Sequence, residues 1–342
     1  MGPLNTVHHL SVSSFGNDDG YRTICLPVPI VHIFGAAKGI LTPLVSKGTS
    51  CVFPFYSPDT LSSLKAIEKY KCHTFIGSPT LYVDLLNHPD RKKYDISSLQ
   101  NTLIGASTVP PDLLLKMKSE LGIKKIIVGY GMTETSLLAS QTIHSDSLVS
   151  YRKAFESVGR PIGFTEAKIV NPETGKIVSV NNDGELCLRG FNILKEYYNE
   201  PEKTKDAFDD HGWFKTGDIC SMDEDGYLYY KSRSKDIIIR GGTNIYPAEI
   251  EAFIRTNPKI IGACVFGIPD ERLGEEVAVW LIVKPNMDFT INDLKSFCDG
   301  QIAQFKIPKY LKLVDSFPIN ANGKVMRNKI IEIAKEEFKN SL

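Results

Sequence analysis

The sequence of 342 residues carries no net charge and contains no long hydrophobic run. Lysine and arginine together number 40, as do aspartate and glutamate, so no surplus of either sign would attract nucleic acid or an anionic membrane surface. No apolar stretch reaches the roughly 20 residues that a membrane-spanning helix requires. The sequence also shows no secretory leader and no arginine-rich transit segment. We therefore expect neither a nucleic-acid partner nor a membrane span.

Paired cysteines are equally scarce. The seven cysteines stand singly, with no CxxC spacing, and the seven histidines are dispersed as well. Such an unpatterned set is typical of reduced thiols in a protein core, and it argues against a metal site built from cysteine. The cysteines are Cys25, Cys51, Cys72, Cys187, Cys220, Cys264 and Cys298.

Length and composition indicate a globular protein with room for two domains. Hydrophobic residues make up 42% and charged residues 23%, which is ordinary for a folded, soluble chain. From Ile24 onward, strand and helix patterns alternate, which favours α/β layers. Apolar residues at helical spacing predict a helix over 60–71, and Pro111 and Gly122 are placed to begin and end another.

The pattern changes twice in the second half of the chain. Between about residues 155 and 231, short β runs separated by Asn/Asp-Gly turns predict a small antiparallel or barrel-like unit. Beyond Lys235-Asp236 the α/β pattern returns, with a helix predicted over 247–255. The spacing of Thr290 and Asp293 is typical of a capping box and predicts a further helix.

Residues 129–135, Gly-Tyr-Gly-Met-Thr-Glu-Thr, are the most informative stretch. They follow the β-branched run 126–128, which predicts a buried strand. Two glycines allow the backbone to pass close to a ligand. Thr133 can hydrogen-bond a phosphate oxygen, and Glu134 is a hard oxygen ligand suited to Mg²⁺. Alone, the stretch fits a purely structural turn about equally well.

Four further motifs follow in a fixed order. They are 184–190 (GELCLRG), 213–218 (WFKTGD), 232–247 (SRSKD running into RGGTNIYP) and 318–324 (PINANGK).

The series resembles the adenylate-forming superfamily, which comprises acyl-CoA synthetases, luciferases and the adenylation domains of peptide synthetases. Segments 87–90, 94–99 and 305–310 are most similar to medium-chain acyl-CoA ligases. The resemblance covers nearly the whole chain from about Thr23. It implies an α/β fold in which a large AMP-binding domain with a small β unit, residues 1–235, precedes a smaller α+β lid domain, residues 236–342.

One family feature is missing. The Ser/Thr/Gly-rich loop ending in Pro-Lys, which wraps the β- and γ-phosphates of ATP, does not occur in the sequence, nor does the half of the large domain that comes before it. We therefore expect a truncated large domain and an adenylation activity that is impaired in this chain. A catalytically inactive fragment that still binds nucleotide or a partner is the alternative from another functional class.

The resemblance implies an ATP-dependent fatty acid–CoA ligase, a medium-chain enzyme that forms an acyl-adenylate and then an acyl-CoA thioester. Its partners would be a fatty acid, ATP and coenzyme A, with AMP and Mg²⁺ at the same site. Another carboxylate activator, such as an aryl-CoA ligase, remains an alternative. The resemblance implies a mitochondrial location, and otherwise we expect a cytoplasmic one. Acyl-chain length and oligomeric state do not follow from the sequence.

Site roles are carried over position by position. Thr133 would contact phosphate and Glu134 would hold Mg²⁺. The backbone of Gly105-Ala106-Ser107, together with Tyr130 and Gly131, would flank adenine. Asp218 would accept both ribose hydroxyls, with an ordinary turn carboxylate after Gly217 as the alternative. Arg233 would contact the ribose-phosphate side of the nucleotide.

The remaining roles are the hinge, the adenylation lysine, the loop for thioester formation and the acyl pocket. Lys235 matches the hinge, and Lys324 would reach the substrate carboxylate and the α-phosphate, although a lysine in a turn is usually only solvated. Gly241-Gly242 would admit the pantetheine arm, and a plain hairpin turn is compatible with that role. His32 aligns with a pocket residue near the acyl carboxylate, and a satisfied core histidine is an equally good interpretation.

Overall fold

The computed structural model describes residues 22–46, 48–54, 60–142, 153, 156–320 and 325–338. The chain divides into two compact units. The first comprises the chain up to Thr216 together with Cys220–Tyr230, and the second comprises Gly217–Ile219 together with the chain from Lys231 onward.

A seven-stranded sheet forms the centre of the first unit, in the order β2-β1-β3-β4-β5-β6-β7. The first five strands in that order are parallel, and β6 and β7 extend the sheet antiparallel. The strands are β1 (Arg22–Cys25), β2 (Thr49–Val52), β3 (Thr74–Gly77), β4 (Asn101–Gly105), β5 (Lys125–Tyr130), β6 (Ser140–Gln141) and β7 (Arg160–Pro161). The buried strand predicted over 126–128 is confirmed as the middle of β5.

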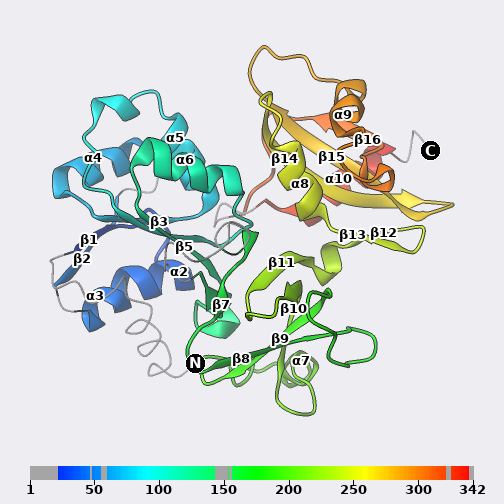
Figure 1. Ribbon diagram of the computed structural model, residues 1–342, viewed down its shortest axis with the longest axis horizontal. Helices are drawn as coiled ribbons and strands as arrows, with labels where there is room; N and C mark the ends of the chain where they lie inside the picture. Colours follow the sequence, from blue (N-terminus) through cyan, green and yellow to red (C-terminus); the bar gives the residue numbers. More distant parts are fainter. Residues whose placement is uncertain are drawn as a thin grey trace. The chain divides into compact units, whose positions relative to one another are not determined.

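Helices cover both faces of this sheet (Figure 1). Successive strand residues point to opposite faces, so Phe75 packs with one helical layer while Ile76 packs with the other, as do Val128 and Ile127. The first layer holds α4 (Leu61–Tyr70), α5 (Pro79–Asn87) and α6 (Pro111–Leu121), with the short η2 (Arg91–Lys93) after α5. The second holds α2 (Ile33–Gly35), the π-helix η1 (Ala36–Leu41) and α3 (Thr42–Val45).

Local sequence signals fix the ends of these helices. Helix α6 begins at Pro111 and ends before Gly122, as predicted. Gly122 adopts φ +68°, a left-handed conformation that disfavours other residues, and its N–H bonds to the Met117 carbonyl. Helix α4 confirms the helix predicted over 60–71.

A four-stranded sheet follows, in the order β11-β10-β9-β8. Strands β8 and β9 pair antiparallel, which confirms the small antiparallel unit predicted between residues 155 and 231. The elements are β8 (Thr165–Val170), β9 (Gly184–Gly190), α7 (Pro201–Ala207), β10 (Phe214–Met222) and β11 (Leu228–Arg233). Its core residues Leu186, Leu188 and Leu228 also pack against Tyr130, the last residue of β5, and Met132, which follows it.

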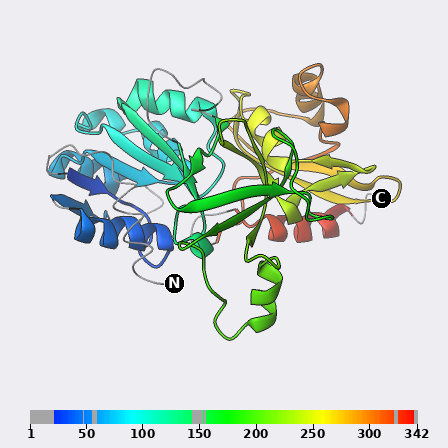
Figure 2. The same cartoon turned by 60° about the horizontal axis from the view of Figure 1, so that its bottom comes forward.

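The second unit is a smaller α+β layer. The order β13-β12-β15-β14 runs across its sheet, and β16 adds parallel to β15. Helices α8 and α9 pack on one face, and α10 packs on the other (Figure 2). The elements are η5 (Ser234–Asp236), β12 (Ile238–Arg240), β13 (Thr243–Ile245), α8 (Pro247–Ile254), β14 (Ile260–Asp270), β15 (Gly274–Val283), α9 (Ile291–Cys298), η6 (Gln304–Lys306), β16 (Tyr310–Leu313) and α10 (Arg327–Phe338).

Two helix predictions in this unit are confirmed. Helix α8 begins at Pro247, and Arg255 is its C-cap. Helix α9 starts after the Thr290–Asp293 capping box: the Thr290 side chain accepts from the Asp293 N–H, and the Asp293 carboxylate accepts from the Thr290 N–H at 2.7 Å.

Arg327 opens α10, although a cation is disfavoured at the N-terminal end of a helix dipole. Hydrogen bonds from its guanidinium to two carboxylates offset this cost. One nitrogen bonds to Asp236 at 3.1 Å and another bonds to the buried Glu251. Glu251 also accepts the N–H of Val265 in β14 at 2.8 Å. These bonds join α10 to η5, which contains Asp236, and to α8, which contains Glu251.

All seven cysteines are free, and six of them are buried, as expected for core thiols. Among the described residues, no helix has the length and apolar character needed to cross a bilayer. Within the same residues, no group of three or more histidine, cysteine or acidic side chains is arranged to hold a metal ion.

Candidate functional site

The carboxyl ends of β4 and β5 lie side by side at one edge of the parallel sheet. Gly105 pairs with Gly129, and a Cβ atom on Gly105 would stand 2.4 Å from the Gly129 carbonyl oxygen, so only glycine fits. Ala106 then turns into the left-handed region at φ +72°, leaving Ala106 and Ser107 exposed beside Tyr130. Open α/β sheets bind ligands at this edge.

A tight turn continues from β5. A Cβ atom on Gly131 would lie 1.9 Å from the Leu137 carbonyl oxygen, so the turn folds back directly over this glycine. The buried Thr135 hydroxyl closes the turn η3 (Thr133–Thr135), because it accepts the Met132 N–H at 3.0 Å. Thr133 is exposed and Glu134 is half-buried. The structure thus brings 105–107 and 129–135 together.

Asn192 fixes this turn and was not anticipated from the sequence. Its fully buried amide donates to the carbonyls of Thr135 (3.5 Å) and Leu138 (3.3 Å). Its own backbone carbonyl accepts the Ser136 hydroxyl at 2.8 Å. The partners are more than fifty residues away in the chain, so no local pattern could have identified Asn192.

Glu134 is held at both its backbone and its side chain. Its carbonyl accepts the Leu194 N–H at 2.8 Å, and its Oε1 accepts the Tyr197 hydroxyl at 3.1 Å. Burial and the neighbouring Glu134 charge raise the pKa of Tyr197 to about 12. The phenol therefore keeps its proton at neutral pH and is the donor in this bond. The ammonium of Lys203 lies 4.2 Å from the centre of the Tyr197 ring.

His32 lies beyond the carboxyl end of β1 and caps α2. Its Nδ1 accepts the Phe34 N–H at 3.2 Å, so the neutral imidazole carries its proton on Nε2. The structure therefore gives this half-buried residue a local structural role.

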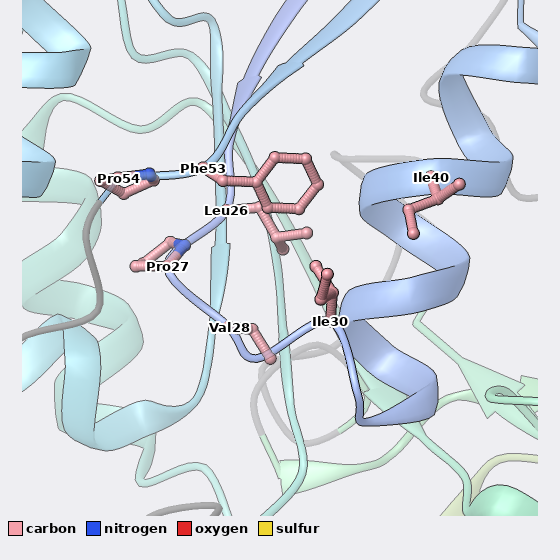
Figure 3. Close-up of a pocket in the computed structure, with 7 residues that line it drawn as sticks. All are labelled: Leu26, Pro27, Val28, Ile30, Ile40, Phe53 and Pro54. Carbon is pink, nitrogen blue, oxygen red and sulfur yellow. The ribbon is translucent and has the colours of Figure 1, made fainter.

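An apolar pocket of about 410 Å³ opens near the carboxyl ends of β1 and β2 (Figure 3). Figure 3 shows the Phe53 ring over Leu26, with Ile40 facing both from η1. Its lining carries no charged side chain, so it suits hydrocarbon rather than a phosphate or carboxylate. None of the site residues predicted from the sequence lines it. The lining residues are Leu26, Pro27, Val28, Ile30, Ile40, Phe53 and Pro54.

The second unit brings another pair of predicted residues together. Asp218 is 1% exposed, and its Oδ1 lies 2.8 Å from Nε of Arg233. The Ser234 hydroxyl donates to the Gly217 carbonyl at 3.0 Å, which joins β10 to the start of η5. Lys235 is exposed within η5.

Gly241 and Gly242 form the turn between β12 and β13. Both adopt positive φ, +57° and +79°, a conformation that glycine adopts more readily than other residues. The Gly241 N–H donates to Leu273 at 2.7 Å. Just before the turn, Arg240 pairs through two nitrogens with the buried Glu276.

Lys324 lies outside the described residues. Val325, which follows it, forms an antiparallel bridge with Ile319, and the Met326 N–H donates to the Pro318 carbonyl at 2.8 Å. The first residues of the 318–324 motif are therefore paired with the residues that follow Lys324.

Family models match both parts of the chain. Residues 4–198 match the AMP-binding enzyme family, and residues 249–324 match the AMP-binding enzyme C-terminal domain. A zebrafish (Danio rerio) protein, the mitochondrial medium-chain acyl-CoA ligase ACSF2, is 40% identical over 315 residues, which are 92% of this chain and 51% of that protein. The putative acyl-CoA synthetase YngI of Bacillus subtilis is 39% identical, over 92% of this chain and 56% of its own length. The chain spans about half the length of the curated relatives it matches.

Solved structures share the fold. ATP-bound MatB of Rhodopseudomonas palustris superposes with a TM-score of 0.86 at 28% identity, covering 98% of this chain and 64% of MatB. The anthranilate CoA ligase AuaEII, solved with anthranoyl-AMP, gives 0.87 at 26% identity, with the same coverage of each chain. These matches support the α/β fold with a large domain and a smaller C-terminal domain that the sequence predicts.

Proposed function

The chain belongs to the AMP-binding enzyme family, and from this membership we propose that it acts in an ATP-dependent ligase joining a medium-chain fatty acid to coenzyme A. The observation that carries the proposal is the edge of the parallel sheet. There the exposed residues Ala106 and Ser107 lie beside Tyr130 and the turn that carries Thr133 and Glu134.

The reaction has two steps. The fatty acid carboxylate attacks the α-phosphorus of ATP, forming acyl-AMP and releasing pyrophosphate. The thiol of coenzyme A then attacks the acyl carbon, losing its proton, and AMP leaves. Both steps bring anions together, so fixed donors and cations must stabilise the charge that develops. We assign phosphate contact to Thr133 and contact with the carboxylate and α-phosphate to Lys324.

The residues present fit a magnesium ion. The Glu134 carboxylate and the Thr133 hydroxyl are hard oxygen donors on adjacent residues, the chemistry that Mg²⁺ prefers. Mg²⁺ is usually bound by one or two carboxylates, with phosphate and water oxygens completing its shell. When bound, it would neutralise charge on the phosphates. Glu134 would be its protein ligand.

The remaining predicted residues are assigned to the nucleotide. We assign the backbone of Gly105-Ala106-Ser107, with Tyr130 and Gly131, to adenine. We assign Asp218 to the ribose hydroxyls and Arg233 to the ribose-phosphate side. The ion pair between Asp218 and Arg233 supports a joint role, since one contact orients the other.

A change of pose would separate the two steps. We propose Lys235 as the hinge, with 1–235 and 236–342 as the domains that it joins. Gly241 and Gly242, lacking side chains, would let the pantetheine arm approach in the second pose. We assign His32 to the acyl pocket, near the substrate carboxylate. We also propose a mitochondrial location, which rests on the name of the animal relative ACSF2.

An aryl acid is the second candidate substrate, favoured by the likeness to the anthranilate ligase AuaEII. Supplying octanoate, anthranilate or benzoate separately, with ATP, Mg²⁺ and CoA, distinguishes the two. Mass spectrometry would follow acyl-AMP and acyl-CoA for each acid. Octanoyl-CoA as the main product supports the proposal, and an aryl-CoA product would replace it.

Lys324→Ala supplies the mechanistic test. It should lower octanoyl-AMP formation by about 10²–10³, the usual effect of removing one charge-stabilising donor. Thioester formation from preformed octanoyl-AMP should be spared. The assay should use this chain and any longer form of the protein that carries it. Nucleotide binding without any acyl-AMP in either form would favour the non-catalytic alternative.

A further inference from the structure

Tyr197 makes a hydrogen bond to Glu134 that none of the proposed roles uses. It lies 63 residues from Glu134 in sequence, yet its hydroxyl bonds to Glu134 Oε1 at 3.1 Å. A carboxylate can rotate about its side-chain torsions, and one fixed hydrogen bond on one oxygen restricts that rotation. The direction in which the other oxygen, Oε2, points is then fixed, and its chemistry is unchanged.

The position of Tyr197 is itself fixed. Its backbone N–H donates to the Thr204 hydroxyl at 2.9 Å, and the Lys203 ammonium lies over its ring. Thr204 in turn donates to the Glu200 carbonyl at 2.9 Å, within the first turn of α7. Tyr197, whose hydroxyl bonds to Glu134, is therefore attached to the first turn of α7.

The turn that carries Glu134 does not need this bond to stay folded. Asn192 holds the carbonyls of Thr135 and Leu138, and Leu194 holds the carbonyl of Glu134. These contacts fix the backbone, whereas Tyr197 contacts only the carboxylate. Asn192 and Leu194 therefore hold the backbone of the turn, and Tyr197 sets the orientation of the Glu134 carboxylate.

We infer that Tyr197 is a positioning residue that orients the Glu134 carboxylate toward a nucleotide-bound divalent cation. The inference rests on the proposed function, because it requires Glu134 to be the metal ligand. Residues that hydrogen-bond a metal ligand typically contribute 10–100-fold to metal affinity.

The test compares Tyr197→Phe with Tyr229→Phe. Tyr229 also donates its hydroxyl to a carboxylate, that of Asp223 at 2.9 Å, so the control removes the same kind of bond elsewhere in the same unit. Mn²⁺ binding is measured by the paramagnetic resonance signal of free Mn²⁺, with a non-hydrolysable ATP analogue present. The Mg²⁺ concentration for half-maximal octanoyl-AMP formation is measured in parallel.

Tyr197→Phe should weaken Mn²⁺ binding and raise the Mg²⁺ requirement about tenfold. The rate at saturating Mg²⁺ should change less than twofold, and Tyr229→Phe should match the wild type. In a Glu134→Gln background, Tyr197→Phe should have no further effect. Equal behaviour of the two tyrosine variants would overturn the inference.

Hydrogen exchange separates orientation from structural support. The amides of Leu194 and Thr135 should exchange equally in wild type and Tyr197→Phe, and faster exchange in the variant would overturn the inference. If Tyr197→Phe weakens Mn²⁺ binding but neither this chain nor a longer form that carries it makes acyl-AMP, the inference is supported and the ligase proposal is rejected. If Mn²⁺ does not bind the wild type, both the inference about Tyr197 and the ligase proposal are rejected.

Discussion

The turn after β5 and the hairpin between β12 and β13 are both glycine-containing, and both are assigned to the active site, but they are held differently. Asn192 and Leu194, from a distant segment, bond to three carbonyls of residues 134–138. The hairpin is held through Arg240, which pairs with Glu276, and through the Gly241 N–H, while residues 241–243 are exposed.

The difference matches the tasks proposed for the two loops. A group that stabilises developing charge is most effective when it is fixed in advance, because no reorganisation is then needed during the reaction. A loop that must let a thiol pass needs a fixed base and an unobstructed tip. Variants that loosen the first loop or obstruct the second should therefore have opposite signatures.

Asn192→Ala should have the largest effect, because it leaves the carbonyls of Thr135 and Leu138 buried without their donor. An unsatisfied buried polar group costs about 1–3 kcal/mol, so we expect a loss of about 2–4 kcal/mol in the free energy of unfolding. Urea denaturation measures it. The exposed Asn182→Ala is the control, and a loss of less than about 0.5 kcal/mol in Asn192→Ala would mean that the turn is not pinned.

Gly241→Leu should lower the thioester step by about 10², the usual cost of misplacing a reacting group, while leaving acyl-AMP formation intact. Its Cβ would lie 3.3 Å from a Leu273 methyl, and the branches beyond it would cover the tip. Accumulation of octanoyl-AMP with CoA present is the readout. Gly300→Leu is matched, since Gly300 has φ +68° and nothing within 4 Å of its added Cβ. An equal loss of the thioester step in both variants would show that backbone strain, and not obstruction of the thiol, causes the effect.

Asp218→Ala should weaken acyl-AMP binding about tenfold, because hydrogen bonds to a charged group contribute about 1.5–3 kcal/mol and about 1.4 kcal/mol is a factor of ten. Calorimetry would compare a non-hydrolysable acyl-AMP analogue with its 2′,3′-dideoxy form. The wild type should distinguish the two ligands and the variant should not. Identical preference in both proteins would leave Asp218 as a partner of Arg233 alone.

Arg240→Lys should have the smallest effect and tests how far the hairpin depends on its base. Lysine keeps the charge but cannot form the two-nitrogen contact with Glu276. We expect the thioester rate to fall less than about fivefold, which corresponds to roughly 1 kcal/mol. Stopped-flow thioester formation from octanoyl-AMP measures it. A loss as large as that of Gly241→Leu would show that the base, not the open tip, controls the step.

The sequence predicts the parts of this fold that depend on neighbouring residues. Pro111, Gly122 and the Thr290–Asp293 pair act within one helical turn, so their effects are visible in a short window. Asn192 and Tyr197 act across 57 and 63 residues, and their types alone give no signal. The resemblance identified residues that would touch ligand but not those that hold them in place.

Arg327 has a consequence for the order in which the second unit can form. It bonds to Asp236 and Glu251, which precede it by 91 and 76 residues. Loops of that length close late because their entropy must be lost before the contacts form. During synthesis, the buried carboxylate of Glu251 lacks this cation until α10 has left the ribosome. We therefore expect nascent chains released before Arg327 to remain sensitive to protease across the whole second unit.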